Sequence, residues 1–161
     1  MSLDLSRWQD PLAIQQAIYS MRRVAIVGLS SNRLRASHFV GFYLRRHGVQ
    51  VIPVNPREKE VFGVRSVPTL ADVTEPVDIV DVFRAPDALP AIAREAVQIC
   101  AKMLWCQYTV INEEGGRIAE QGGLSVVMDR CLKVEHARYV GRMHWLGFNT
   151  QRITSVRGGL Q

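Results

Sequence analysis

The chain has 161 residues, of which 47% are hydrophobic and 22% are charged, and its formal net charge is +5. This composition is typical of one globular domain with a real core and excludes a low-complexity chain. No stretch approaches the roughly 18 consecutive apolar residues of a membrane span, and the N-terminus lacks the apolar region of a signal peptide. Three cysteines without a C-x-x-C pair indicate reduced thiols. We therefore expect a soluble, cytoplasmic protein without a membrane partner.

The positive charge favours an anionic partner, either nucleic acid or a phosphate-rich small molecule. The basic residues are spread along the chain, and neither an RNP-type aromatic motif nor a zinc-finger spacing accompanies them. We therefore expect a small phosphate-rich ligand and no nucleic acid.

Asp10 and Pro11 form an N-cap and first-turn pair that predicts a short amphipathic helix. The chain then alternates between apolar runs and helical stretches. The apolar runs span 24–27, 49–54, 77–83, 102–106 and 124–128, and the helical stretches lie near 36–47, 87–100, 113–121 and 130–142. Strands separated by helices imply βαβ units and a parallel sheet. The sequence predicts one α/β, Rossmann-like domain whose five-stranded, mainly parallel sheet carries helices on both faces.

We expect three segments along this chain. Residues 1–22 contain an N-terminal helix that packs on the domain, 23–142 form the Rossmann-like domain, and 143–161 form a C-terminal extension or tail. The extension contains apolar Trp145, Leu146 and Phe148, which either pack on their own domain or form a surface for self-association. A homo-oligomer and an unknown protein partner both remain open.

The loop after the first apolar run has the beginning of a nucleotide-binding turn. Gly28 permits a tight turn, and we expect a Cβ there to meet the next helix or the ligand. The dinucleotide pattern G-x-G-x-x-G is absent, because Ser30 and Arg33 occupy its second and third glycine positions. The serines and the helix N-terminus near Ser37 could bind a phosphate, or the loop could simply cap the helix.

The loop after the second apolar run reads Val54-Asn55-Pro56-Arg57. A domain that binds NAD usually has Asp or Glu here, which accepts hydrogen bonds from the ribose hydroxyls. An asparagine followed by an arginine argues against NAD and favours a ligand with an extra phosphate near its ribose.

Further candidate residues follow the other three runs. Phe83 and Arg84 provide an apolar wall with a cation, and Gln107 follows the fourth run. Arg130 and Cys131 follow the fifth run at the start of a helix, where the helix dipole and the guanidinium are expected to favour the thiolate. A buried, inert cysteine is the alternative.

No recognisable catalytic or metal site emerges from the sequence. Cys131 and His136 lack an Asp or Asn placed to orient them, and Asp78 and Asp81 point to opposite faces of a strand. There is no Gly-Lys-Ser/Thr end of a P-loop. An NAD(P)-dependent oxidoreductase is the rival interpretation, although no tyrosine is followed by a lysine four residues later.

Five segments together suggest a family. The succession VAIVGLSSNRLRAS, VIPVNPR, VDIVDVFRAPDALPAIAREA, LWCQ and VVMDRCLKVEHAR resembles the small, stand-alone CoA-binding proteins. Their fold is similar to the N-terminal CoA-binding domain of the succinyl-CoA synthetase alpha subunit. The resemblance runs from about residue 24 to residue 138, and its most specific pieces are VNPR, DVFR and MDRC-x-x-x-EH.

The resemblance implies a site for CoA or an acyl-CoA and assigns its residues. The diphosphate and the 3′-phospho-ribose would lie around one group of residues: Gly28, Ser30, Ser31, Arg33 and Ser37. Asn55, Pro56 and Arg57 would border the ribose and its 3′-phosphate. Phe83 and Arg84 would flank the adenine and pantetheine path, with Gln107 and Arg130 further along.

The sequence also departs from the family pattern. Related proteins usually have a glycine-containing turn after W-x-Q, whereas this chain continues with Tyr108, Thr109 and Val110. This departure leaves the shape of the pantetheine end of the site open. Because no catalytic site is recognised in the sequence, we expect a CoA-binding protein without catalysis of its own. A thiol-based role through Cys131 is a further alternative.

Overall fold

The computed structural model describes residues 3–140. It contains one five-stranded sheet in the order β2-β1-β5-β6-β7, in which every pairing is parallel. Its strands are β1 (Arg23–Val27), β2 (Gln50–Val54), β5 (Ile79–Val82), β6 (Met103–Cys106) and β7 (Ser125–Val127). The sequence-based prediction of an α/β fold with a five-stranded parallel sheet is confirmed.

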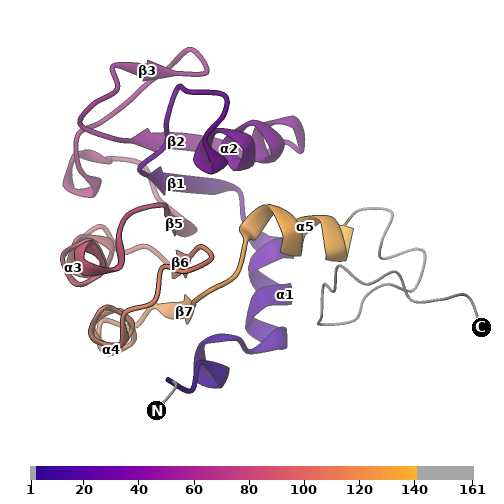
Figure 1. The fold of residues 1–161 in the computed structure, drawn as a ribbon, viewed down its shortest axis with the longest axis vertical. Coiled ribbons are helices and arrows are strands. Elements are labelled where there is room, and N and C mark those ends of the chain that lie inside the picture. Colours follow the sequence, from indigo (N-terminus) through magenta and orange to yellow (C-terminus); the bar gives the residue numbers. More distant parts are fainter. Residues whose placement is uncertain (1–2, 141–161) are drawn as a thin grey trace, which may run out of the picture.

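Helices cover both faces of this sheet (Figure 1). α1 (Pro11–Ser20), α2 (Ala36–Arg46) and α5 (Leu132–Val140) pack on one face, whereas α3 (Leu89–Gln98) and α4 (Glu113–Gln121) pack on the other. Because both faces are covered, the strands need apolar residues at nearly every position, which is why they appear in the sequence as continuous apolar runs.

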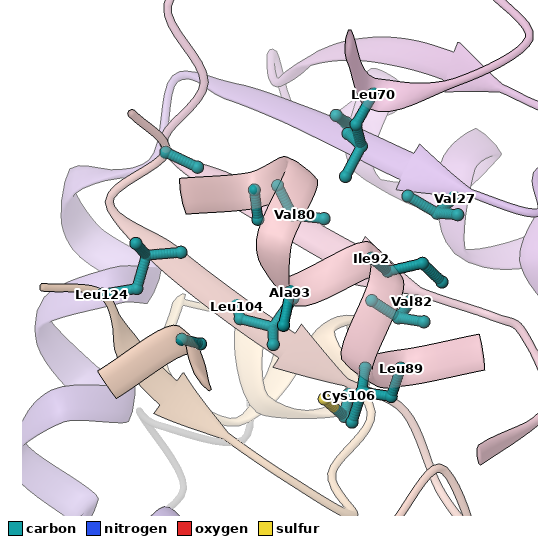
Figure 2. Close-up of a cluster of buried hydrophobic side chains, with 14 of the residues drawn as sticks. Val27, Leu70, Val80, Val82, Leu89, Ile92, Ala93, Leu104, Cys106 and Leu124 are labelled. Carbon is teal, nitrogen blue, oxygen red and sulfur yellow. The ribbon is translucent and has the colours of Figure 1, made fainter. Parts of the chain in front are cut away.

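The core therefore has two halves, one on each side of the sheet. Figure 2 shows the half beneath α3 and α4, where Val80 and Val82 of β5 and Leu104 of β6 meet Leu89 and Ala93 of α3. The opposite half contains Ile14 and Ile18, so α1 is part of the core. The extension 143–161, including Trp145, lies outside the described residues.

The helix ends follow the local sequence signals. The Asp10 side chain accepts hydrogen bonds from the backbone N–H groups of Leu12 and Ala13, as expected of an N-cap. Gly48 follows α2 with a φ of +81°, a value that favours glycine. α3 begins later than the sequence suggested, because Pro86–Ala88 form a separate 3₁₀ turn.

One element was not predicted from the sequence. β3 (Glu60–Val61) and β4 (Val64–Arg65) form a small antiparallel hairpin after β2. Its turn places Phe62 and Gly63 at φ values of +57° and +75°. Two consecutive positive φ values match the tight turn that joins short hairpin strands. The hairpin holds Phe62 against α2, where its ring lies 4.7 Å from that of His38.

Candidate functional site

The strand order places the topological switch point between β1 and β5, where ligands of such folds bind. A pocket of about 320 Å³ lies at the carboxyl ends of these strands, between the loops after β1, β2 and β5. A second pocket of about 310 Å³ adjoins it and shares Ala36, Phe83 and Arg84 as lining residues. We call them the loop pocket and the Cys131 pocket, and together the cleft.

Most of the site residues predicted from the sequence line this cleft. The loop pocket is lined by Gly28, Ser30, Ser37, Asn55, Arg57, Phe83 and Arg84, and the Cys131 pocket by Gln107 together with the last two of these. Ser31 and Pro56 lie in the same loops but do not line it. Arg33 lines a separate apolar pocket on α2, and the side chain of Arg130 lies beside α1.

Gly28 leaves no room for a side chain. Its φ is +90°, and a Cβ at this position would lie 2.8 Å from the backbone oxygen of Phe83. Within the protein, the obstacle is therefore the loop after β5 and not the next helix, which was one of the two obstacles expected from the sequence. Any side chain here would strain the backbone itself, so a larger residue would disturb the fold as well as a ligand.

The loop after β1 presents donors for an anion. Ser37 stands in the first turn of α2, whose N-cap residue Arg35 offers no side-chain hydrogen bond. The Ser37 hydroxyl accepts a hydrogen bond from the backbone N–H of Ser30 at 3.1 Å. Ser31 donates through its backbone N–H and its hydroxyl to one carboxylate oxygen of Glu58, at 2.9 and 3.0 Å. A side-chain anion thus already occupies two donors of this loop.

Asn55 fixes the loop after β2 to the loop after β1. Its side-chain amide donates to the backbone oxygen of Leu29 at 3.0 Å, and its side-chain oxygen accepts from the backbone N–H of Arg57. Asn55 is buried, and its hydrogen bond to Leu29 lies out of water. Its role is therefore to position the two loops, and it leaves the guanidinium of Arg57 at the surface of the cleft.

The loop pocket has an excess of positive charge. Arg35, Arg57 and Arg84 line it, and Glu58 is its single acidic lining residue. Within residues 3–140, no side chain forms a hydrogen bond or ion pair with any of these three guanidinium groups. Unpaired guanidinium groups next to a helix N-terminus are well suited to phosphate oxygens.

The Cys131 pocket has a more apolar lining. Val40, Phe83, Val110 and Tyr108 line it together with Cys131, which is 9% exposed. Burial raises the pKa of the Cys131 thiol, against the lowering effect of the backbone N–H groups of Val134 and Lys133. The expectation of a favoured thiolate is therefore wrong. The guanidinium of Arg130 bonds to Gln9 and to the Asp129 backbone instead.

A buried carboxylate lies beneath this pocket. Asp81 is 0% exposed, and its Oδ1 accepts a hydrogen bond of 2.6 Å from the side-chain amide of Gln107. Its Oδ2 has no hydrogen-bond partner within the described part of the chain. Burial raises the pKa of Asp81 to about 7, and the bond from Gln107 opposes this shift. Gln107 therefore reaches inward from the cleft wall, toward a carboxyl group whose protonated form is favoured by burial.

Neither a metal centre nor a membrane-spanning helix is found in residues 3–140. No group of three or more His, Cys, Asp or Glu side chains there could hold a metal ion. No helix in that range is long and apolar enough to cross a membrane.

Comparison with known proteins fits this geometry. The model of the CoA binding domain family matches residues 22–137. The chain belongs to this family. The uncharacterized protein YneT of Bacillus subtilis (strain 168) is 39% identical over 124 residues, which are 77% of this chain and 92% of that protein.

Solved structures share the fold. A hypothetical protein from Pyrococcus horikoshii OT3 is 30% identical with a TM-score of 0.81, over 88% of this chain and 99% of that one. A dinucleotide-forming acetyl-coenzyme A synthetase from Ca. Korarchaeum cryptofilum is 21% identical with a TM-score of 0.57, over 75% of this chain and 26% of that one. At this identity the likeness to the synthetase concerns the fold alone.

Some residues of the cleft were not predicted from the sequence. Arg35 lines the loop pocket in place of Arg33, because the loop turns between the two residues. Glu58 was not predicted, because a carboxylate is unexpected beside a phosphate site. The serine-rich loop after β1, whose Ser31 donates two hydrogen bonds to Glu58, was the only sequence feature that indicated such a partner. The sequence placed Asp81 in a strand but did not predict its hydrogen bond with Gln107, which is 26 positions away.

Proposed function

We propose that the protein binds coenzyme A or an acyl-CoA in the cleft, at the carboxyl ends of the parallel strands, without catalysis of its own. The observation that carries this proposal is the set of three arginines around the loop pocket, Arg35, Arg57 and Arg84, whose guanidinium groups have no side-chain partner within residues 3–140. CoA carries a diphosphate and a 3′-phosphate, and guanidinium groups bind phosphate oxygens through paired, charge-assisted hydrogen bonds.

The shape of the cleft supports a long ligand. The phosphates and the ribose would occupy the loop pocket, with Arg57 near the 3′-phosphate and the N-terminus of α2 near the diphosphate. The pantetheine arm would pass Phe83 and Arg84 into the Cys131 pocket, whose lining is more apolar. Gln107 would then stand beside the arm.

The proposal of binding without catalysis rests on the residues that line the cleft. They include neither histidine nor lysine, and the thiol of Cys131 has a raised pKa. His136, which the sequence places five positions after Cys131, bonds to Tyr43 between α2 and α5. These residues can recognise a ligand but offer no paired nucleophile and base.

Two measurements test the proposal. Mass spectrometry of small molecules released from the purified protein should identify CoA or an acyl-CoA. Calorimetric titration of ligand-free protein should give saturable binding of CoA and much weaker binding of NAD and NADP. Tighter binding of NAD or NADP than of CoA would favour an oxidoreductase and overturn the proposal.

Cys131 supports a second candidate function, a thiol-based role. Its side chain lines the pocket that would receive the thiol end of CoA, which would raise the local concentration of that thiol. Oxidised CoA should then form a mixed disulfide at Cys131: the Cys131 thiolate attacks the CoA disulfide, and one CoA leaves as its thiolate. Peptide mapping is the test, with exposed Cys100 as the internal control. Modification of Cys100 alone would contradict this role.

A further inference from the structure

A pocket of about 360 Å³ lies between the N-terminal segment, α1 and α5, and shares no lining residue with the cleft. α1 and α5 pack side by side there (Figure 1). Its polar lining residues include Gln9, Arg130, Glu135 and Arg138, and Ile14 forms part of its apolar wall. The motif MDRC-x-x-x-EH supplies Arg130 and Glu135, and the function proposed for the cleft gives Glu135 no role.

A buried arginine in this pocket has an unused donor. The side chains of Arg138 and Glu135 are 4% and 3% exposed and form an ion pair at 3.5 Å. Nε of Arg138 has no hydrogen-bond acceptor within residues 3–140. A buried guanidinium N–H without an acceptor is unfavourable, because it has lost water without gaining a partner. An acceptor supplied by a ligand would remove this cost.

A second guanidinium faces the same pocket. Arg130 donates to the side-chain oxygen of Gln9 at 3.0 Å and to the backbone oxygen of Asp129 at 2.9 Å. These two bonds hold its orientation. Two arginines and one glutamate are the charged residues that line the pocket, so its lining carries one excess positive charge when Glu135 is ionised.

We propose that this pocket binds a small organic monocarboxylate, with Arg138 Nε and the Arg130 guanidinium donating to its carboxylate oxygens. A ligand with one negative charge balances the single excess positive charge of the lining, whereas Glu135 would repel a dianion such as hydrogen phosphate. A planar carboxylate matches the fork of donors on a guanidinium. Pro11, Ile14 and Tyr139 provide apolar walls for a compact hydrocarbon body, and the volume suits a small molecule.

The test uses the full-length protein and observes the Nε–Hε signals of its arginines by NMR. Sodium acetate, butyrate and benzoate are titrated at constant ionic strength, beside butyramide, benzamide and inorganic phosphate. We expect a saturable shift of the Arg138 signal with carboxylates, tighter for benzoate than for acetate, and none with the amides or phosphate. The proposal would be overturned if benzamide or phosphate shifted the Arg138 signal as much as benzoate does. It would also be overturned if no carboxylate gave a saturable shift.

Variants give an independent measurement. Arg138→Lys keeps the charge but removes Nε, and it should weaken benzoate binding by about 10-fold or more, as expected for loss of a charge-assisted hydrogen bond. Arg94→Lys is the matched control, because Arg94 forms an exposed ion pair with Glu114 on the other face of the sheet. Its benzoate affinity should be unchanged. Unchanged affinity in folded Arg138→Lys, or an equal loss in both variants, would contradict the assignment.

If Arg138→Lys fails to fold, Gln9→Ala takes its place. This change removes the acceptor that orients Arg130 without touching the buried ion pair. It should lower benzoate affinity several-fold, and unchanged affinity would count against the proposal.

Discussion

Glu58 occupies donors that a ligand phosphate would need. Its carboxylate accepts two hydrogen bonds from Ser31, within a pocket that otherwise has an excess of arginines. Glu58→Gln removes the negative charge and keeps an oxygen that can accept from Ser31. We expect this variant to bind CoA about 3–30-fold more tightly, because a repulsive charge next to the phosphates is lost.

Calorimetric titration of Glu58→Gln beside Glu75→Gln measures this effect. Glu75 is an exposed residue outside the cleft, so its variant controls for the change in net charge. An equal gain in both variants, or weaker binding in Glu58→Gln, would show that Glu58 does not compete with the ligand.

Asp81 makes stability depend on pH. Its pKa is about 7 in the folded protein, against 3.8 as the ordinary value. A carboxyl whose folded pKa is raised adds stability that is fully present below the unfolded pKa and is lost as pH rises through the folded one. The free energy of unfolding of the wild type, relative to Asp81→Asn, should therefore fall by about 2–3 kcal/mol between pH 5 and pH 8.

Urea denaturation of both proteins at several pH values gives this difference. Asp81→Asn keeps an oxygen that can accept the hydrogen bond from Gln107, so the pair is not lost with the charge. Parallel pH profiles for the two proteins would mean that Asp81 does not titrate in this range.

At the level of single residues, the sequence was informative where local chemistry decides. Gly28 and Asn55 line the loop pocket, where the glycine turn and the strand-end amide of the sequence placed them. Arg33 and Arg130 face other pockets, since the direction of a side chain depends on neighbours distant in the sequence. For Arg130 that neighbour is Gln9.

Two histidines lie where α2 meets α5. The ring of His136 accepts or donates one hydrogen bond with the Tyr43 hydroxyl at 2.9 Å, and the His47 ring lies 5.1 Å away. The ammonium group of Lys133 lies over the Tyr43 ring. Burial and, to a lesser extent, His47 lower the pKa of His136. The folded protein therefore resists protonation of His136, and stability is lost as pH falls below the ordinary histidine pKa.

We expect His136→Gln to reduce the loss of unfolding free energy that the wild type shows as the pH falls. Glutamine stays neutral and can still bond to Tyr43, so the variant should lose less unfolding free energy than the wild type between pH 7.5 and pH 5.5. Thermal or urea unfolding measures this, with His38→Gln as the control from the opposite side of α2. Identical acid profiles for wild type and His136→Gln would refute the role of His136.

At the level of elements, apolar runs gave the five strands of the sheet to within two residues at each end. This worked because strands buried on both faces lack polar positions. The β3–β4 hairpin could not be predicted in the same way. Each of its strands has two residues, and its turn begins with Phe62 instead of a typical turn residue.

At the level of the whole molecule, the fold concentrates an excess of positive charge at the carboxyl ends of the central strands. The helix–strand alternation predicted a parallel sheet, but it did not give the strand order β2-β1-β5-β6-β7. That order depends on pairing between segments far apart in the chain. It brings the loops after β1, β2 and β5 together, so that arginines from three loops, Arg35, Arg57 and Arg84, border one pocket.

The loop pocket is proposed to recognise the phosphates of CoA, including the 3′-phosphate. Calorimetric titration of CoA and dephospho-CoA, with the wild type and with Arg57→Ala, measures this recognition. We expect the wild type to prefer CoA, and Arg57→Ala to reduce this preference by about 1.5–3 kcal/mol, as expected for loss of a charge-assisted hydrogen bond. Equal affinity of the wild type for the two ligands would show that the 3′-phosphate is not recognised.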